Sequence, residues 1–410
     1  MQIKPILAAM RYHKAGTVLI ALQIALTLAI VCNALFIIHQ RVERLSRPSG
    51  VDESNLFVIH NDWAENATPQ EVDAQMRADL LALRHLGSVQ DAAPANSFPL
   101  NGGGWDNYIK LTPDTTKGII DSSIFFADDH TLATLGAHLI EGSNFTSTEI
   151  GSQTPPDPML ASQVIISKAL AQRLFPNGSA LGKTIYVSSN HKPSTVIGVT
   201  DTLQSHMTAV RYPDFAYNAV LVPARLSSDS TYYLVRARPG QLADAMRDTP
   251  KALYAQNRMR IISAKDGVMT FAEVRKRFYK GDLGMAILMG IVSIVLLAIT
   301  AAGIVGLTSF WVGQRRKQIG IRRALGASRY DILSYFLTEN LLIGSVGVLI
   351  GAVLAYGINL WMVTQFEMAR LSLGYVLMGM LALLLLGQGA VLAPARRASR
   401  VSPVEATRSV

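Results

Sequence analysis

The sequence predicts an α-helical membrane protein, with four transmembrane helices and an α+β extracytoplasmic domain inserted between helices 1 and 2. Three observations predict this fold class. Four long apolar segments carry no charge, a region of about 240 residues separates the first two segments, and basic residues gather on one side of the predicted spans. Only 16% of the 410 residues are charged, whereas soluble proteins average about a quarter.

Each apolar segment is longer than the roughly 18 residues that mark a membrane-spanning helix. One charge at the bilayer centre costs about 2.5–3.5 kcal/mol, so four uncharged runs are a strong signal. The uncharged runs are residues 18–38, 283–311, 340–363 and 371–395, and we place the four helices at residues 18–38, 283–312, 335–363 and 371–395. The first segment also has features of a cleaved signal peptide, but it is long for one and no small-x-small cleavage site follows it. We therefore expect it to remain as an anchor.

The basic residues predict the orientation of the helices, because loops rich in lysine and arginine stay in the cytoplasm. Thirteen basic residues lie near the span ends on one side, opposed only by Asp331 and Glu405. They are Lys4, Arg11, Lys14, Arg315, Arg316, Lys317, Arg322, Arg323, Arg329, Arg396, Arg397, Arg400 and Arg408. This pattern assigns residues 1–17, 313–334 and 396–410 to the cytoplasm and residues 364–370 to a short periplasmic loop.

The net charge of +9 therefore reflects topology, and nucleic-acid binding is not expected. Without the residues near the cytoplasmic span ends, the chain has nearly equal numbers of basic and acidic residues. Arg41, Arg44 and Arg47, just outside the first span, depart from the charge rule locally.

Residues 39–282 are too many for a loop and predict a periplasmic domain of mixed α and β structure. Two similar units occur in it, each a strand followed by a helix. Their segments are strand 56–60, capping box 68–71 with its helix, strand 231–238, helix 241–256 and strand 259–264. We expect the two units to share a sheet, with residues from about 116 to 226 inserted between them as a subdomain. Within the insertion we expect strands 163–167, 184–187 and 195–200, a helix ending at Leu174, and an exposed loop with Pro155, Pro156 and Pro158.

A further capping box, residues 270–273, begins a helical pattern that leads into the second span. An unbroken helix from Phe271 to Trp311 would be about 60 Å long, roughly twice the hydrocarbon thickness. The sequence thus predicts a stalk from about residue 271. Gly281 and Gly284 are hinge candidates, and the alternative is two helices broken at Gly281.

Small residues recur every four positions in three spans, a spacing that lets helices approach closely. The sets are Ala21, Ala25 and Ala29; Ala298, Ala302 and Gly306; and Gly347, Gly351 and Ala355. The third set carries the most weight because it contains two glycines. Glu339, at the cytoplasmic entry of the third span, has two interpretations: a proton or substrate site, or an interfacial carboxylate paired with a nearby arginine.

The cytoplasmic loop 313–334 carries apolar residues that topology alone does not require. Ile319, Ile321, Ala324 and Leu325 lie between its six basic residues, spaced so that a short helix would carry an apolar strip. A loop that only had to stay in the cytoplasm would need no such strip. We therefore expect this loop to dock against another protein.

The sequence contains no pattern that predicts an enzyme site, a metal or a cofactor. Cys32 is the only cysteine and lies within the first span. Residues 177–184 resemble a phosphate-binding loop, but Asn177 stands where glycine is needed, and a turn between helix and strand explains the segment better. Residues 128–130 have metal-ligand side chains, but a solvated turn is the simpler interpretation. Residues 102–105 form a glycine-rich loop with two interpretations, contact with a ligand or, more simply, a bare turn.

Residues 316–327, RKQIGIRRALGA, followed by FLTENLL at 336–342, resemble the MacB/FtsX family of ABC-transporter permeases. Gln318 stands where the family usually has glutamate. Three more segments are similar to the family: the tail at 394–406, and 134–146 and 165–185, which look like its periplasmic core domain. The resemblance covers nearly the whole chain.

The resemblance implies a permease subunit in the bacterial inner membrane, whose cytoplasmic loop forms a coupling helix seated in a groove of an ABC ATPase. The residues implied for this helix are Gln318, Ile319, Ile321, Arg322, Arg323, Ala324, Leu325 and Gly326. The ATPase is expected on a separate chain. Because two ATPase domains sandwich ATP, a second permease is implied too, as a homodimer or with a paralogue, along with membrane lipid and a possible periplasmic adaptor protein.

We expect the loop to move when ATP is bound and hydrolysed, and the long second helix to pass that movement to the periplasmic domain. By resemblance, the expected outcome is export of substrates. The alternatives are an FtsX-like signalling scaffold that transports nothing, and lipoprotein release. The size of the domain at 39–282 favours export over the scaffold, whose members tend to have smaller periplasmic domains.

Overall fold

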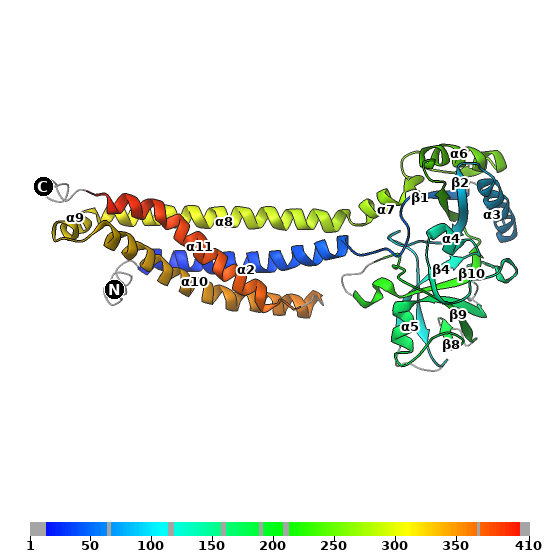
Figure 1. Ribbon diagram of the computed structural model, residues 1–410, viewed down its shortest axis with the longest axis horizontal. Coiled ribbons are helices and arrows are strands. Elements are labelled where there is room, and N and C mark those ends of the chain that lie inside the picture. The colour runs from blue at the N-terminus through cyan, green and yellow to red at the C-terminus, as the bar shows by residue number, and fades with distance from the viewer. Residues whose placement is uncertain are drawn as a thin grey trace. The chain divides into compact units, whose positions relative to one another are not determined.

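The computed structural model confirms the predicted fold class (Figure 1). It describes residues 14–63, 67–113, 119–155, 157, 161–187, 192–207, 213–366 and 370–401. The chain forms two compact units, a helical unit of Met1–Ser46 and Gly281–Val410 and an α/β unit of Arg47–Lys280. Several residues used above lie outside the described residues: Lys4, Arg11, Pro156, Pro158, Glu405 and Arg408.

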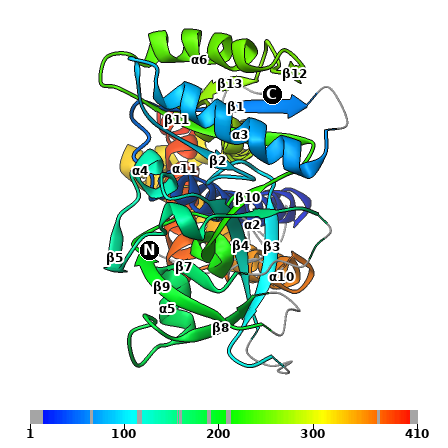
Figure 2. The ribbon, with the colours of Figure 1, turned by 90° about the vertical axis from the view of Figure 1, so that its right-hand side faces the viewer.

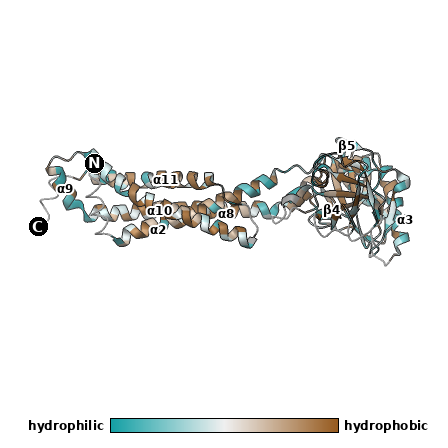
Figure 3. Ribbon diagram, turned by 90° about the horizontal axis from the view of Figure 1, so that it is seen from below, coloured by the Kyte–Doolittle hydropathy of each residue, from teal (hydrophilic) through white to brown (hydrophobic). Residues whose placement is uncertain are grey.

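The helical unit contains the four predicted spans and one short helix. The elements are α2 (Lys14–Leu45), α8 (Lys280–Gln314), α9 (Arg316–Ala324), α10 (Arg329–Phe366) and α11 (Leu373–Ser399). All but α9 are long and apolar enough to cross a membrane (Figure 3). Three of the four begin and end outside the predicted bounds, because the helical backbone continues past the uncharged core into polar residues. α11 begins later than predicted, at the cap formed by Ser372.

The glycines of α10 let it pack closely against α2. A Cβ atom added at Gly347 would lie 2.9 Å from the Ala21 carbonyl oxygen, and one at Gly351 would lie 2.8 Å from that of Ala25. One step along, the Asn33 side chain donates a hydrogen bond of 3.1 Å to the Ala355 carbonyl. The small residues of the first and third spans therefore face each other, as the four-residue spacing predicts.

The small residues of α8 behave differently. Ala298, Ala302 and Gly306 are exposed, and other residues of α8 contact α2, among them two polar pairs. The Thr27 and Thr300 hydroxyls lie 2.8 Å apart, and the Gln23 amide donates to the Ile299 carbonyl at 3.1 Å. The close packing expected of Ala298, Ala302 and Gly306 is therefore not realised within the described chain.

The helix leading into the second span is not continuous. α7 (Phe271–Phe278) begins at the predicted capping box of Thr270 and Glu273, but it ends before Tyr279, and α8 starts at Lys280. Tyr279 is buried in the α/β unit, where its hydroxyl accepts a hydrogen bond from Gln204. The helix is therefore interrupted at Tyr279, two residues before Gly281, where the alternative interpretation placed the break. The prediction of an unbroken helix from Phe271 to Trp311 was wrong.

The two similar units of the α/β domain share one sheet, as expected. Its strand order is β12-β1-β11-β2, with β13 paired to β1, and α3 and α6 pack beside each other against it (Figure 2). The elements are β1 (Leu56–Trp63), α3 (Pro69–Arg84), β2 (Val89–Ala95), β11 (Ser230–Ala237), α6 (Leu242–Gln256), β12 (Arg260–Ile261) and β13 (Val268–Thr270). The Thr68–Glu71 capping box is present, and the apolar face of α3 is buried in the core.

The second sheet has the order β4-β3-β8-β9-β7-β10-β6, and β4 also pairs with β10, which closes six of its strands into a ring. Its elements are β3 (Trp105–Lys110), β4 (Ile120–Ala127), α4 (Thr131–Leu135), β5 (Leu139–Gly142), β6 (Gly151–Gln153), β7 (Gln163–Ser167), α5 (Lys168–Leu174), β8 (Thr184–Val187), β9 (Ser194–Thr200) and β10 (Ala219–Leu226), with 3₁₀ turns at Ser147–Glu149 and Pro213–Tyr217. We predicted that the inserted subdomain begins at about residue 116. It begins earlier, because β3 (Trp105–Lys110) pairs with β4 and β8 of this sheet.

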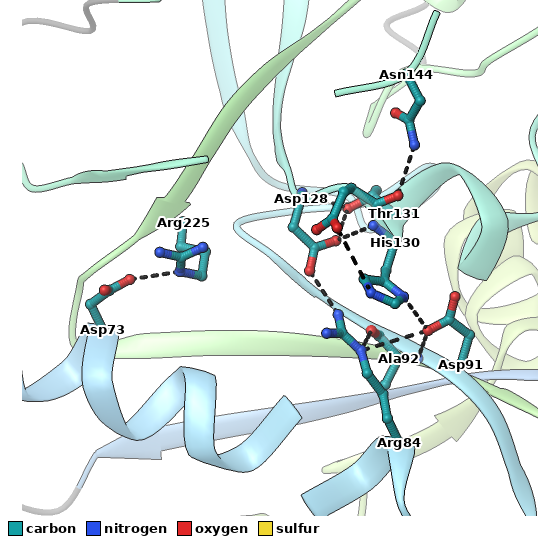
Figure 4. Close-up of polar contacts among 10 residues, drawn as sticks. Asp73, Arg84, Asp91, Ala92, Asp128, His130, Thr131, Asn144 and Arg225 are labelled. Atoms are coloured by element: carbon teal, nitrogen blue, oxygen red, sulfur yellow. Dashed lines mark hydrogen bonds and ion pairs between the residues drawn. The ribbon is translucent and has the colours of Figure 1, made fainter. Parts of the chain in front are cut away.

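Buried ion pairs connect the two sheets. Arg84 of α3 donates to Asp128, at the end of β4, at 2.8 Å, and Asp73 of α3 accepts from Arg225 of β10 at 2.7 Å (Figure 4). The sheets therefore form one folded body in which α3 is tied to both.

A buried histidine lies between β4 and the loop after β9. His206 is inaccessible to solvent, its Nδ1 lies 2.9 Å from the Ser123 hydroxyl, and its Nε2 lies 3.4 Å from Asp106 Oδ1. Burial lowers the pKa of His206 from 6.5 to about 4. Burial also raises the pKa of Asp106. The imidazole is therefore neutral at pH 7 in the folded protein.

We predict that replacing Gly351 by alanine destabilises the helical unit, although alanine is normally the better helix former. The added methyl group has no room beside the Ala25 carbonyl, and overpacking of this kind costs about 1–3 kcal/mol. Thermal unfolding of the detergent-solubilised chain measures the effect. Gly357→Ala is the matched control, since its Cβ would meet open space on the same helix. Equal stability of the two variants would contradict the packing.

We predict that the α/β unit loses stability as the pH falls from 6.5 towards 4. The unfolded state binds a proton at His206 near pH 6.5 and the folded state only near pH 4, so the loss at pH 5 is about 2 kcal/mol. Asp106 works in the opposite direction, so the histidine term is isolated as the difference between the wild type and His206→Gln. Urea unfolding, followed by tryptophan fluorescence, measures this difference. Trp311 and Trp361 of the helical unit are replaced first, so that only Trp63 and Trp105 of the α/β unit contribute to the signal.

The exposed His85→Gln variant controls for the change in histidine number. An identical pH dependence in the wild type and His206→Gln would contradict the assignment to His206.

Candidate functional site

The short helix α9 connects two candidate spans and is bounded by local signals. It ends at Ala324 because Gly326 adopts a left-handed backbone (φ 96°), which glycine tolerates. Two residues later, the Ser328 hydroxyl accepts from the Asp331 amide at 3.2 Å, and Asp331 accepts from the Ser328 amide at 2.9 Å. This reciprocal cap starts α10 and fixes the turn between the two helices.

A buried ion pair fastens the beginning of α9 to α10. Arg315 donates to both carboxylate oxygens of Glu339, at 3.1 and 3.0 Å, and both side chains are buried. The guanidinium also lies over the ring of Trp311. The structure therefore supports the second interpretation of Glu339, a carboxylate paired with a nearby arginine.

Arg323 fastens the other end of α9 to the end of α11. Its guanidinium donates to the carbonyls of Ser399, at 3.1 Å, and Val401, at 2.9 Å. The last carbonyls of a helix lack intrahelical hydrogen-bond donors and carry partial negative charge. A guanidinium at this position donates the missing hydrogen bonds and compensates the charge. Arg323 therefore has a structural role, whereas the sequence assigned it to the docking site.

The apolar strip predicted for α9 is divided between two faces. Ile319 is 5% exposed and belongs to the same buried cluster as Trp311, Ile332 and Phe336. Ile321 is 49% exposed and Leu325 is 83% exposed, and Ala324 beside them is exposed too. We call Ile321, Ala324 and Leu325 the docking face. The inclusion of Ile319 in an outward strip was wrong, because residues two apart on a helix point in different directions.

The basic residues of this segment are divided in the same way. Arg315 and Arg323 are engaged within the chain, and the Arg322 guanidinium lies 5.2 Å from the centre of the Tyr335 ring. Other polar side chains on or beside the helix are exposed to solvent: Arg316, Lys317, Gln318 and Arg329. The result is an exposed apolar patch with basic residues around it, on a helix fixed at both ends.

The two hinge candidates lie inside the first turns of α8. A Cβ atom at Gly281 or Gly284 would meet no other atom within 4 Å. Between them, Asp282 pairs with Arg41 and Arg44 near the end of α2. These pairs give the local departure from the charge rule a structural role, because they hold the ends of α2 and α8 together.

The other candidates from the sequence are structural. Asp128 is buried and paired with Arg84 (Figure 4). Asp129 and His130 form a half-exposed turn, in which His130 Nδ1 lies 2.8 Å from Asp91. Among the described residues, no group of three His, Cys, Asp or Glu side chains could hold a metal ion. Residues 177–184 form the connection between α5 and β8, as expected.

Two family models match the chain over most of its length. The model described as "MacB-like periplasmic core domain" matches residues 17–252, and the one described as "FtsX-like permease C-terminal" matches residues 290–403. The second match contains α9 and its anchors. These matches define the class of protein as an integral membrane permease with an extracytoplasmic core domain, and the chain belongs to the MacB/FtsX-like family of ABC transporter permeases.

Individual relatives agree with this assignment. The macrolide export ATP-binding/permease protein MacB of Chromobacterium violaceum is 26% identical over 78% of this chain and 49% of its own length. An uncharacterized ABC transporter permease, YvrN of Bacillus subtilis, is 25% identical over 70% of this chain and 69% of its own. The periplasmic region of MacB from Actinobacillus actinomycetemcomitans aligns with 57% of this chain and 97% of that chain, at 13% identity and a TM-score of 0.35. The chain spans about half the length of the MacB relatives it matches.

We predict that Arg315→Leu destabilises the helical unit strongly, by about 3 kcal/mol or more, because it leaves the Glu339 carboxylate buried without its partner. The double variant Arg315→Leu, Glu339→Leu should recover most of the loss, since no buried charge remains. Thermal unfolding in detergent of the wild type, both single variants and the double variant completes the cycle. Additive losses would show that the two side chains do not interact.

Proposed function

We propose that the chain is the permease subunit of an ABC transporter, in which α9 couples ATP hydrolysis by an ABC ATPase to movement of the α/β unit, and that this movement drives export. The observation that carries the proposal is the docking face. Ile321, Ala324 and Leu325 expose apolar surface on a helix of nine residues between two candidate spans. Leaving such a patch in water is costly, whereas a hydrophobic groove on a partner would cover it.

The anchors of α9 support a mechanical role. Arg315 ties the helix to α10, Arg323 ties it to α11, and the Ser328–Asp331 cap fixes the turn that follows. A push on the docking face would therefore move the ends of two spans together with α9. An untethered loop would absorb the same push by bending. Because α9 also follows α8 directly, the same force would reach the helix that precedes it in the chain.

The charge distribution supports a cytoplasmic location for α9. Arg316, Lys317 and Arg329 are exposed near the docking face, and loops rich in such residues stay on the cytoplasmic side. The α/β unit would then lie in the periplasm, across the bacterial inner membrane. The exposed basic residues would pair with carboxylates at the rim of the ATPase groove, which favours fast association and correct orientation.

The ATPase is proposed on a partner chain, and a second permease completes the transporter so that two ATPase domains can enclose ATP. The proposed outcome is export, in keeping with the name of the Chromobacterium relative as a macrolide export protein. A periplasmic adaptor protein would receive the substrate on the outer side.

We predict that Leu325→Asp abolishes association with the ATPase while the chain still inserts in the membrane. A carboxylate at the most exposed apolar position of the docking face would be buried without a partner, and the loss should exceed about tenfold. The tagged chain is purified from its own bacterium, the ATPase is identified by mass spectrometry, and its amount and ATP hydrolysis are measured per permease.

Leu81→Asp is the matched control, because Leu81 is an exposed leucine on α3, outside the docking face. It should retain the ATPase at the wild-type level. Undiminished co-purification with Leu325→Asp would refute the docking face, and the absence of any ABC ATPase from the wild-type preparation would refute the proposed function.

A further inference from the structure

The α/β unit contains a cavity of about 760 Å³ that no part of the proposed mechanism uses. This volume lies within the range of about 300–1,000 Å³ typical of sites for small molecules. Its walls come from β1, β11, the loop after β2, the segment around β13, and α7.

One wall is the glycine-rich loop that the sequence singled out. A Cβ atom at Gly102 or Gly103 would meet no atom within 4 Å, so this part of the wall is backbone with open space in front of it. The loop is nevertheless held in place. The Gly102 amide donates to the His206 carbonyl at 2.8 Å, and the Gly103 carbonyl accepts from Asn101 at 2.9 Å and from Ser97. The space is therefore preformed, which limits the ordering cost of binding.

The floor of the cavity is aromatic. Phe98 packs edge-on against Tyr232, with ring centroids 5.2 Å apart, and Tyr232 stacks on His60 at 4.6 Å. Phe278, Met269, Leu100 and Val274 add further apolar lining. Aromatic faces carry negative electrostatic potential, so this surface suits a ligand with an apolar body and a positive charge.

The charged side chains of the lining favour a cation. Among the described residues that line the cavity, Arg277 is the only lysine or arginine, and it pairs with Asp266 at 3.2 Å. Asp62 has only His60, at 3.4 Å, as an ion-pair partner among the described residues, and nearly half of its side chain is exposed. An anion would meet Asp62 without a compensating charge, whereas an ammonium group would pair with it.

We propose that this cavity binds a small amphipathic organic cation, with its apolar part against Tyr232, Phe278 and Met269 and its positive group beside Asp62. The site is separate from the docking face and does not depend on the proposed ATPase coupling. Because α7 forms one wall through Val274 and Arg277, an occupied cavity would brace the helix that immediately precedes α8 in the chain.

The test uses two probes of the same shape and opposite charge, tetraphenylphosphonium and tetraphenylborate. Binding to the full chain in lipid nanodiscs is measured by equilibrium dialysis, with empty nanodiscs subtracted to remove partition into lipid. The wild type should bind tetraphenylphosphonium, and it should bind it more tightly than tetraphenylborate. Gly103→Leu, which fills the open space, should weaken binding of the phosphonium more than tenfold.

Asp62→Asn should weaken binding of the phosphonium about three- to tenfold, and Asp62→Glu, which keeps the charge, should stay within about threefold of the wild type. Matched controls are Gly178→Leu, another open glycine of the α/β unit, and Asp244→Asn, which removes the same charge from α6. Both should bind as the wild type does, and unfolding curves identify any variant that fails to fold.

Three results would overturn the proposal. The first is that the wild type binds no more phosphonium than empty nanodiscs do, and the second is that Gly103→Leu binds it as tightly as the wild type. The third is that the wild type binds tetraphenylborate as tightly as the phosphonium. The first two would remove the site, and the third would remove its selection for cations.

Discussion

The fixed position of α9 depends on the buried pair of Arg315 and Glu339. Two charges in a poorly solvated place are tolerated only when they meet in good geometry, and here the guanidinium donates to both carboxylate oxygens. The pair sets the rotation of α9 at its first turn, and Arg323 holds its last turn to the end of α11. With both ends fixed, Ile319 points into the helical unit and Leu325 points to solvent. The same short sequence thus provides an internal anchor and an exposed apolar surface.

The α/β unit follows the same principle on a larger scale. Charged pairs, rather than apolar contacts alone, fix the geometry where two elements must keep a defined relation. Arg84 and Asp73 of α3 reach the second sheet, and Arg275 of α7 pairs with Glu53 at 2.9 Å, close to where the chain enters the unit. The Arg275 guanidinium and the Ser49 hydroxyl lower the pKa of Glu53 despite its partial burial, so the pair is charged at neutral pH. This pair holds α7 against the first residues of the α/β unit.

Much of this fold follows from local rules. The capping boxes at Thr68 and Thr270 were readable because Ser/Thr-x-x-Glu satisfies the first helical amides without help from the rest of the chain. Strands β7 and β9 were found from runs of β-branched residues.

In contrast, β2 has the sequence VQDAAPA, and it is a strand because it pairs with β11, which local propensity does not encode. The break at Tyr279 was missed for a similar reason, since burial of that side chain in the α/β unit is a tertiary event. The inward direction of Ile319, however, could have been deduced from the sequence, because Ile319 and Ile321 are two residues apart on one helix. The roles of Arg315 and Arg323 could not, because their partners lie on α10 and at the end of α11.

Cysteine labelling tests the central claim, that the docking face lies in the cytoplasm, most directly. In a Cys32→Ala background, Lys317→Cys reports on the exposed surface of α9 and Lys265→Cys reports on the α/β unit. A membrane-impermeant maleimide is applied to spheroplasts and to inverted membrane vesicles. The account predicts that Lys317→Cys reacts only in inverted vesicles and Lys265→Cys only in spheroplasts. Labelling of Lys317→Cys from outside the spheroplast would contradict it, because no cytoplasmic ATPase could then reach the docking face.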